Sequence, residues 1–160
     1  MIRALTAVAL LLLGACAAEG RAPAAEVAWL DGAQRAHGRA DEAMAQEDWE
    51  GARAALTDAL AAPPPPGLAA ADARVVRQDL LFRLSEAELR AGHAAVAADR
   101  ADEGLNLGRA ADVFTANLLV ARGRAREALG RSREAAGDYF DALEINDTLL
   151  DQALDGTGAQ

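Results

Sequence analysis

The sequence predicts an all-α fold in which about three helical hairpins stack side by side. Alanine, leucine and arginine are the most frequent residues of the chain, and these three and glutamate are strong helix formers. Valine, isoleucine and tyrosine are scarce, and no run alternates between apolar and polar residues with period two, so a sheet is not expected. Because 52% of the residues are hydrophobic and only 4% are aromatic, the core must be built largely from small side chains, which suits closely packed helices.

The segment 129–146 is the clearest element of the chain. It contains a turn at Gly130 followed by an amphipathic helix. Ala135, Tyr139 and Ala142 form a small-large-small pattern on one face of that helix. One helix cannot bury such a face alone, so the pattern predicts neighbouring helices.

Six helices are expected along the chain. Pro63–Pro66 ends the second, because proline lacks an amide donor and disfavours the helical conformation of the residue before it. Ser132 is a suitable N-cap for the last, since its hydroxyl can accept a hydrogen bond from a free backbone amide. The expected helices are 31–45, 48–61, 69–91, 94–107, 112–129 and 132–145.

The N-terminus has the organisation of an export signal. Arg3 precedes an apolar run, 4–13, that is too short for a bilayer span of about 20 residues. The run ends in Leu13-Gly14-Ala15-Cys16, which resembles the lipobox of bacterial lipoproteins. The resemblance implies that Cys16, the only cysteine, is alkylated with diacylglycerol and acylated on its amine after cleavage before it. The alternative is an ordinary signal peptide that contains a cysteine.

The residue after the cysteine bears on location. In Gram-negative lipoproteins an aspartate there tends to retain the protein in the inner membrane, so Ala17 implies the outer membrane. The expected location is therefore the periplasmic face of the outer membrane, held by a lipid anchor. Gly20 and Pro23 interrupt the stretch that follows, and residues 16–30 are expected to form a flexible tether.

Residues 116–149 resemble a tetratricopeptide repeat, a helix-turn-helix unit of about 34 residues. Gly123 matches the small residue of the first helix, Gly130 matches the turn, and Ala135 with Tyr139 matches the alanine–aromatic pair of the second helix. The sequence also departs from the pattern. Asp147 stands where proline is usual, and the typical leucine and aromatic of the first helix are replaced by Arg122 and Arg126.

Two weaker units, 78–111 and 33–66, precede this one. The matching alanines of the three units, Ala52, Ala97 and Ala135, are 45 and 38 residues apart, so insertions must separate the units. The resemblance implies a short right-handed solenoid of about three hairpins; a generic alanine-rich helical bundle is the alternative. The expected organisation is a signal peptide over 1–15, a tether over 16–30, a repeat domain over 31–149 and a loose tail over 150–160.

The sequence gives no sign of catalysis. His37 and His93 are the only histidines, and both are expected at the surface without metal-ligand spacing around them. Ser85 and Ser132 lack the setting of a catalytic serine. With a net charge of −9, the chain is a poor candidate for nucleic-acid binding. We therefore expect no enzyme activity, no cofactor and no metal.

The remaining candidate is a protein-binding surface. In tetratricopeptide proteins the first helix of each hairpin lines a groove that holds a peptide or a helix. The resemblance assigns to this groove His37, Asp41 and Met44 from the first unit, Phe82, Arg83 and Glu86 from the second, and Asn117, Val120 and Arg124 from the third. Gln34 and Asp79 occupy equivalent positions. Phe82 could instead belong to the core.

These features together predict a membrane-anchored periplasmic scaffold or adaptor for protein or peptide partners in envelope, secretion or pilus assembly. The alternative is a structural envelope lipoprotein that self-associates, for instance as a homodimer, and has no dedicated ligand. The sequence does not identify the partner.

Overall fold

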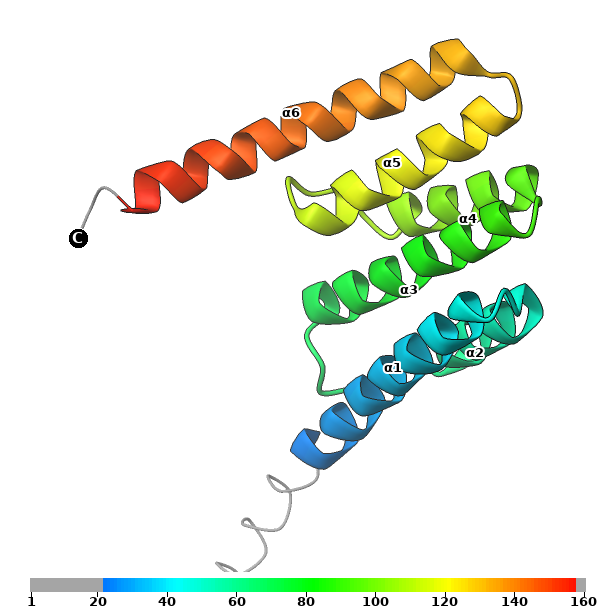
Figure 1. The fold of residues 1–160 in the computed structure, drawn as a ribbon. Coiled ribbons are helices and arrows are strands. Elements are labelled where there is room, and N and C mark those ends of the chain that lie inside the picture. The colour runs from blue at the N-terminus through cyan, green and yellow to red at the C-terminus, as the bar shows by residue number, and fades with distance from the viewer. Residues whose placement is uncertain (1–21, 158–160) are drawn as a thin grey trace, which may run out of the picture.

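The computed structural model describes residues 22–157, and this part of the chain consists of three helical hairpins stacked one on another (Figure 1). Hairpin 1 is α1 and α2, hairpin 2 is α3 and α4, and hairpin 3 is α5 and α6. The helices are α1 (Ala22–Ala45), α2 (Trp49–Ala61), α3 (Ala70–Arg90), α4 (Ala94–Asn106), α5 (Val113–Ala128) and α6 (Ser132–Thr157). The predicted all-α fold of three hairpins is confirmed. The signal peptide and Cys16 lie outside the described residues.

The expected tether through residue 30 is wrong for residues 22–30, which form the first turns of α1. Pro23 is compatible with this start, because the first turn of a helix has free amides in any case and proline has the helical φ already. Trp29 holds the segment in place: its Nε1 donates to the Ala62 carbonyl at the end of α2, over 3.3 Å.

The expected loose tail over 150–160 is also wrong for residues 150–157, because α6 continues to Thr157. Aspartate at position 147 explains the difference. Proline there would remove an amide donor and clash with the preceding turn, whereas aspartate lets the helix run on. At 26 residues, α6 is twice as long as α2 or α4, which have 13 each.

The three hairpins turn in the same way. In each, one residue with positive φ follows the first helix: Glu47 (59°), Gly92 (85°) and Gly130 (75°). The next amide in the chain then bonds back to a carbonyl of the last helical turn, as Asp48, His93 and Arg131 each do at 2.8–2.9 Å. These positions are spaced as Ala52, Ala97 and Ala135 are, so the turn geometry supports the predicted alignment of the units.

Hairpins stack because a leucine from each following hairpin inserts into the one before it. Leu80 of α3 is 1% exposed and packs with Ala33, Ala36 and Leu56 of hairpin 1. Leu118 of α5 is fully buried, with its side chain directly over Gly104 of α4. A Cβ on Gly104 would lie 2.7 Å from Leu118 Cδ2, so only glycine permits this approach.

In hairpin 3, α5 and α6 also pack through a contact between a glycine and a large side chain. A Cβ on Gly123 would lie 2.5 Å from Cε1 of Tyr139, so the ring packs directly on the α5 backbone. The Tyr139 hydroxyl donates to Glu127 Oε2 at 2.6 Å. Burial and this hydrogen bond raise the pKa of Tyr139 to about 12, which keeps the hydroxyl protonated as a donor.

The two arginines that depart from the repeat pattern also have a structural explanation. Asp138 of α6 is 3% exposed and lies between Arg122 and Arg126 of α5. Its carboxylate accepts from Arg122 Nη2 at 2.6 Å and from Arg126 Nη1 at 2.7 Å. A buried carboxylate requires such partners, so the arginines replace an apolar contact between α5 and α6 with a charged one.

The insertions expected between the units, at 63–71 and at 109–115, lie in the two linkers and in the first turns of α3 and α5. The linker between α4 and α5 is held by Gln78, whose fully buried side chain donates to the carbonyls of Gly104 (3.1 Å) and Gly108 (2.8 Å). Arg74 completes the arrangement by donating to Gln78 Oε1 at 2.8 Å and to Asp112 Oδ2 at 3.0 Å. Part of the first insertion lengthens α3, which has 21 residues whereas α5 has 16.

Replacing Glu47 with glycine should stabilise the fold by about 0.5–1 kcal/mol, because a side chain with Cβ is strained at this positive φ and glycine is not. Chemical denaturation measures the change. Glu47→Ala is the matched control, since it removes the carboxylate but keeps Cβ, and it should leave stability nearly unchanged. Equal stability of the glycine and alanine variants would contradict the backbone explanation.

Candidate functional site

The first helices of the three hairpins form one continuous face. α3 packs against both α1 and α5, and side chains at the predicted groove positions bridge from helix to helix. We refer to this surface as the α1–α3–α5 face. Every groove residue assigned from the sequence belongs to one of these three helices.

A cavity of about 260 Å³ opens on this face where the three helices meet. Apolar side chains form most of its wall, and polar groups enter from α1 and α3. It is lined by Leu30, Ala33, Gln34, His37, Val75, Val76, Asp79 and Phe114. An apolar interior with a few converging polar groups is the usual character of a site that takes a small ligand or the anchor side chain of a peptide.

His37 and Asp79 are the polar pair of this cavity. His37 Nε2 lies 3.3 Å from Asp79 Oδ2, but the two groups are not aligned for a hydrogen bond, and within residues 22–157 Nε2 has no hydrogen-bonding partner. Burial lowers the pKa of His37 and Arg83 lowers it further, while Asp79 and Asp41 act in the opposite direction. The imidazole is therefore held in its neutral form, able to donate or accept toward a group in the cavity.

The charged groove residues are paired with one another. Arg83 Nη1 of α3 donates to Asp41 Oδ1 of α1 at 2.5 Å, and Arg124 Nη1 of α5 lies 3.1 Å from Glu86 Oε1 of α3. These pairs hold neighbouring helices in register. A carboxylate ligand would have to displace Asp41 or Glu86, so the two arginines are not free anion sites.

The apolar groove residues serve the core as well. Met44 packs against the core of hairpin 1, and Phe82 and Val120 pack against the core shared by hairpins 2 and 3. All three are only partly buried, so each still presents some surface to a partner. Asn117 is half-buried on α5.

Five apolar cavity residues are absent from the predicted groove: Leu30, Ala33, Val75, Val76 and Phe114. Phe114 was missed because the repeat unit assigned to hairpin 3 begins at residue 116, after the first turn of the helix. Asp112 is the N-cap of α5, since its Oδ1 accepts from the Thr115 amide at 2.8 Å, which agrees with the predicted helix over 112–129. An N-cap at Asp112 places Phe114 in the first turn of α5.

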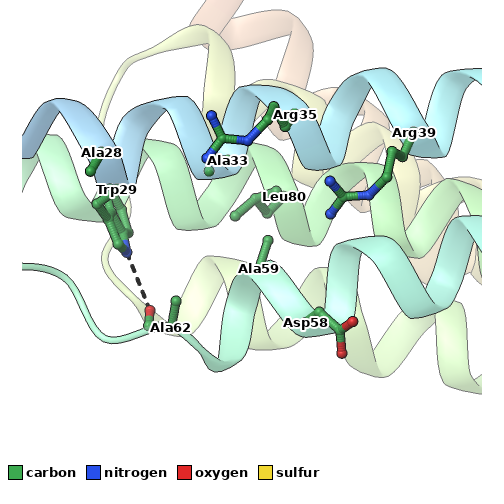
Figure 2. A pocket seen from close by; sticks show the side chains of 10 residues that line it. Ala28, Trp29, Ala33, Arg35, Arg39, Asp58, Ala59, Ala62 and Leu80 are labelled. Carbon is green, nitrogen blue, oxygen red and sulfur yellow. Dashed lines mark hydrogen bonds between the residues drawn. The ribbon is translucent and has the colours of Figure 1, made fainter.

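A second cavity, of about 280 Å³, lies between α1 and α2 (Figure 2). Small residues line much of it, with Trp29 at one end and Leu80 of α3 lying behind the two helices. Arg35 and Arg39 on α1 and Asp58 on α2 stand at its rim (Figure 2). The outer surface of hairpin 1 is therefore polar as well as apolar.

The candidate catalytic side chains have structural partners. Ser85 Oγ donates to the Ala97 carbonyl at 2.8 Å and is buried. His93 Nδ1 lies 2.8 Å from Glu88 Oε2, and Arg53 Nη1 lies 3.2 Å from the same oxygen. This cluster ties α2, α3 and the second hairpin turn together.

No known protein-family model and no curated protein matches this sequence. Within residues 22–157, no helix is long and apolar enough to cross a membrane.

The neutral state of His37 predicts how stability depends on pH. Because its pKa is lower in the folded chain than the ordinary value of about 6.5, the unfolded chain takes up a proton first, and stability falls as the pH drops below about 6.5. His37→Gln should reduce this loss, measured by denaturation at a series of pH values. Gln34→Ala, at the same cavity and without a titratable group, should keep the wild-type slope; an unchanged slope in His37→Gln would contradict the assignment.

Proposed function

We propose that this protein is a non-catalytic, lipid-anchored scaffold that binds a protein or peptide partner on its α1–α3–α5 face, in the periplasm at the outer membrane. The lipobox resemblance of Leu13–Cys16 supports the anchor and the location. The stack of three hairpins supports the scaffold, because a solenoid presents a continuous surface made by successive units.

The apolar cavity beside His37 is the observation that carries the binding proposal. It is open on the face that the first helices form, and it combines an apolar wall with an unsatisfied imidazole nitrogen. An extended segment or helix lying on this face would place one apolar side chain in the cavity and one hydrogen-bonding group against His37. A role in envelope, secretion or pilus assembly fits a tethered adaptor of this kind.

Cys16→Ser should release the protein from the membrane, because the serine hydroxyl cannot take the thioether-linked diacylglycerol on which the anchor depends. Fractionation of cells with immunodetection measures the distribution, and labelling with a palmitate analogue should be lost in the same variant. Ala17→Ser serves as the control that keeps the cysteine. Retention of Cys16→Ser in the membrane fraction would refute the anchor.

A photo-crosslinking residue at Gln34, on the cavity rim, should give a discrete adduct with another protein in cells. The matched control is the same residue at Asp99, which is exposed on α4, away from the cavity. His37→Glu should weaken the Gln34 adduct by introducing a charge at the cavity wall. Equal adducts from both positions, or an adduct that contains only this chain, would reject partner binding at this face; the second result would favour the self-associating structural lipoprotein.

A further inference from the structure

Hairpin 3 exposes an apolar strip along the outer side of α6. Phe140, Leu143 and Leu150 are 60%, 60% and 58% exposed, and their spacing places them along one side of the helix. Leu154 continues the strip and is also exposed. We call this surface the α6 strip.

In the other two hairpins, a neighbouring helix covers the leucine at the position equivalent to Leu143. Leu60 and Leu105 stand as far along the chain from the positive-φ turn residues Glu47 and Gly92 as Leu143 stands from Gly130. Leu105 is 6% exposed and packs with residues of α5, and Leu60 packs against the core beneath α3. α2 lies against both α1 and α3, and α4 against both α3 and α5. Of the described helices, only α5 packs against α6, so hairpin 3 presents a surface that receives a helix elsewhere in the stack.

The α1 end of the stack has a polar residue at the position that corresponds to the inserted leucines. The positions filled by Leu80 in α3 and Leu118 in α5, which insert into the preceding hairpin, are filled by Arg35 in α1. A polar residue there is what a terminal unit of a solenoid requires for solubility. The exposed apolar strip is therefore a property of the α6 end.

The charge of α6 indicates what kind of partner helix would complement the α6 strip. α6 carries seven carboxylates and a single arginine, Arg133. Asp147 lies within the strip, and Glu144 and Asp151 lie along one side of it. Asp138, Asp141 and Glu134 each pair with an arginine, whereas the three carboxylates at the strip form no ion pair within the described residues.

We infer that the α6 strip docks a basic amphipathic helix of another protein. Its apolar residues would cover Phe140, Leu143 and Leu150, and its lysines or arginines would meet Asp147, Glu144 and Asp151. Two copies of this chain docked through their α6 strips would instead bring the same unpaired carboxylates together, which opposes self-association. This surface is separate from the α1–α3–α5 face, and the inference does not depend on the function proposed there.

A designed peptide tests the inference directly. The probe is an amphipathic helix of about 18 residues, with leucines at i, i+3, i+4 and i+7 spacing and with lysine and arginine elsewhere. Anisotropy of the labelled probe, titrated with the full chain, measures affinity. Leu143→Ser should weaken binding about tenfold or more, because one buried leucine contact is lost. Val27→Ser, at a residue of α1 that is similarly exposed (55%), should bind as the wild type does.

Two further comparisons separate specific docking from simple charge attraction. A scrambled peptide of the same composition, and a peptide with the same leucines but glutamate for lysine and arginine, should each bind about tenfold more weakly. Asp147→Asn combined with Asp151→Asn should reduce the dependence of probe affinity on salt concentration. Circular dichroism should show that Leu143→Ser is folded, since the side chain is exposed in the native chain.

Equal binding of the scrambled probe, or of the Leu143→Ser chain, would overturn the inference. Light scattering measures whether the chain forms a dimer through the strip. A dimer at neutral pH and low salt that Leu143→Ser abolishes would assign the strip to a second copy and would also overturn it. Crosslinking at Gln34 reports on the other face, so failure there and failure here can be told apart.

Discussion

The structure depends on helices that approach closely enough for a side chain of one to rest on the backbone of the next. Gly104 beneath Leu118 and Gly123 beneath Tyr139 are two places where a Cβ would overlap a large side chain of the neighbouring helix. Buried alanines play the same part elsewhere, for example Ala36, Ala40 and Ala52 in hairpin 1. A small residue opposite a large one fills the space without a cavity. This is how a chain with few aromatic residues still forms a continuous core.

Close packing along the stack also decides which surfaces remain for partners. The first helices lie side by side, and their charged residues pair across the helix boundaries, as Asp41 does with Arg83 and Glu86 with Arg124. These pairs neutralise much of the predicted groove and leave the cavity beside His37 as its distinctive feature. At the end of the stack, no helix of the described part of the chain covers α6 as α3 covers α2 and α5 covers α4. The molecule thus offers two chemically different surfaces, a small apolar cavity and an acidic, exposed apolar strip.

Much of the fold and part of the site could be predicted from the pattern of residues. The alanine–aromatic pair Ala135 and Tyr139 identified hairpin 3, and the spacing of Ala52, Ala97 and Ala135 identified the alignment of all three units. Predicted groove residues do lie on the three helices of one face. Phe114 and Val76 were missed as cavity residues, because the repeat units assigned from the pattern begin at 116 and 78 and leave out the first turns of α5 and α3. Arg122 and Arg126 depart from the repeat pattern, and only the structure gives the reason, which is that both pair with the buried Asp138.

The sequence by itself determined what is local: which segments are helical, where glycine permits a hairpin turn, and which side of each helix is apolar. These properties follow from backbone preferences and from spacing along one helix. Only the tertiary structure decided what depends on contacts between helices, such as the pairing of Arg83 with Asp41, the unsatisfied nitrogen of His37, and the exposure of Leu143 where Leu105 is covered. The reason is physical: the environment of a side chain is set by residues distant in the chain, and three leucines at equivalent positions acquire different roles when only two have a helix above them.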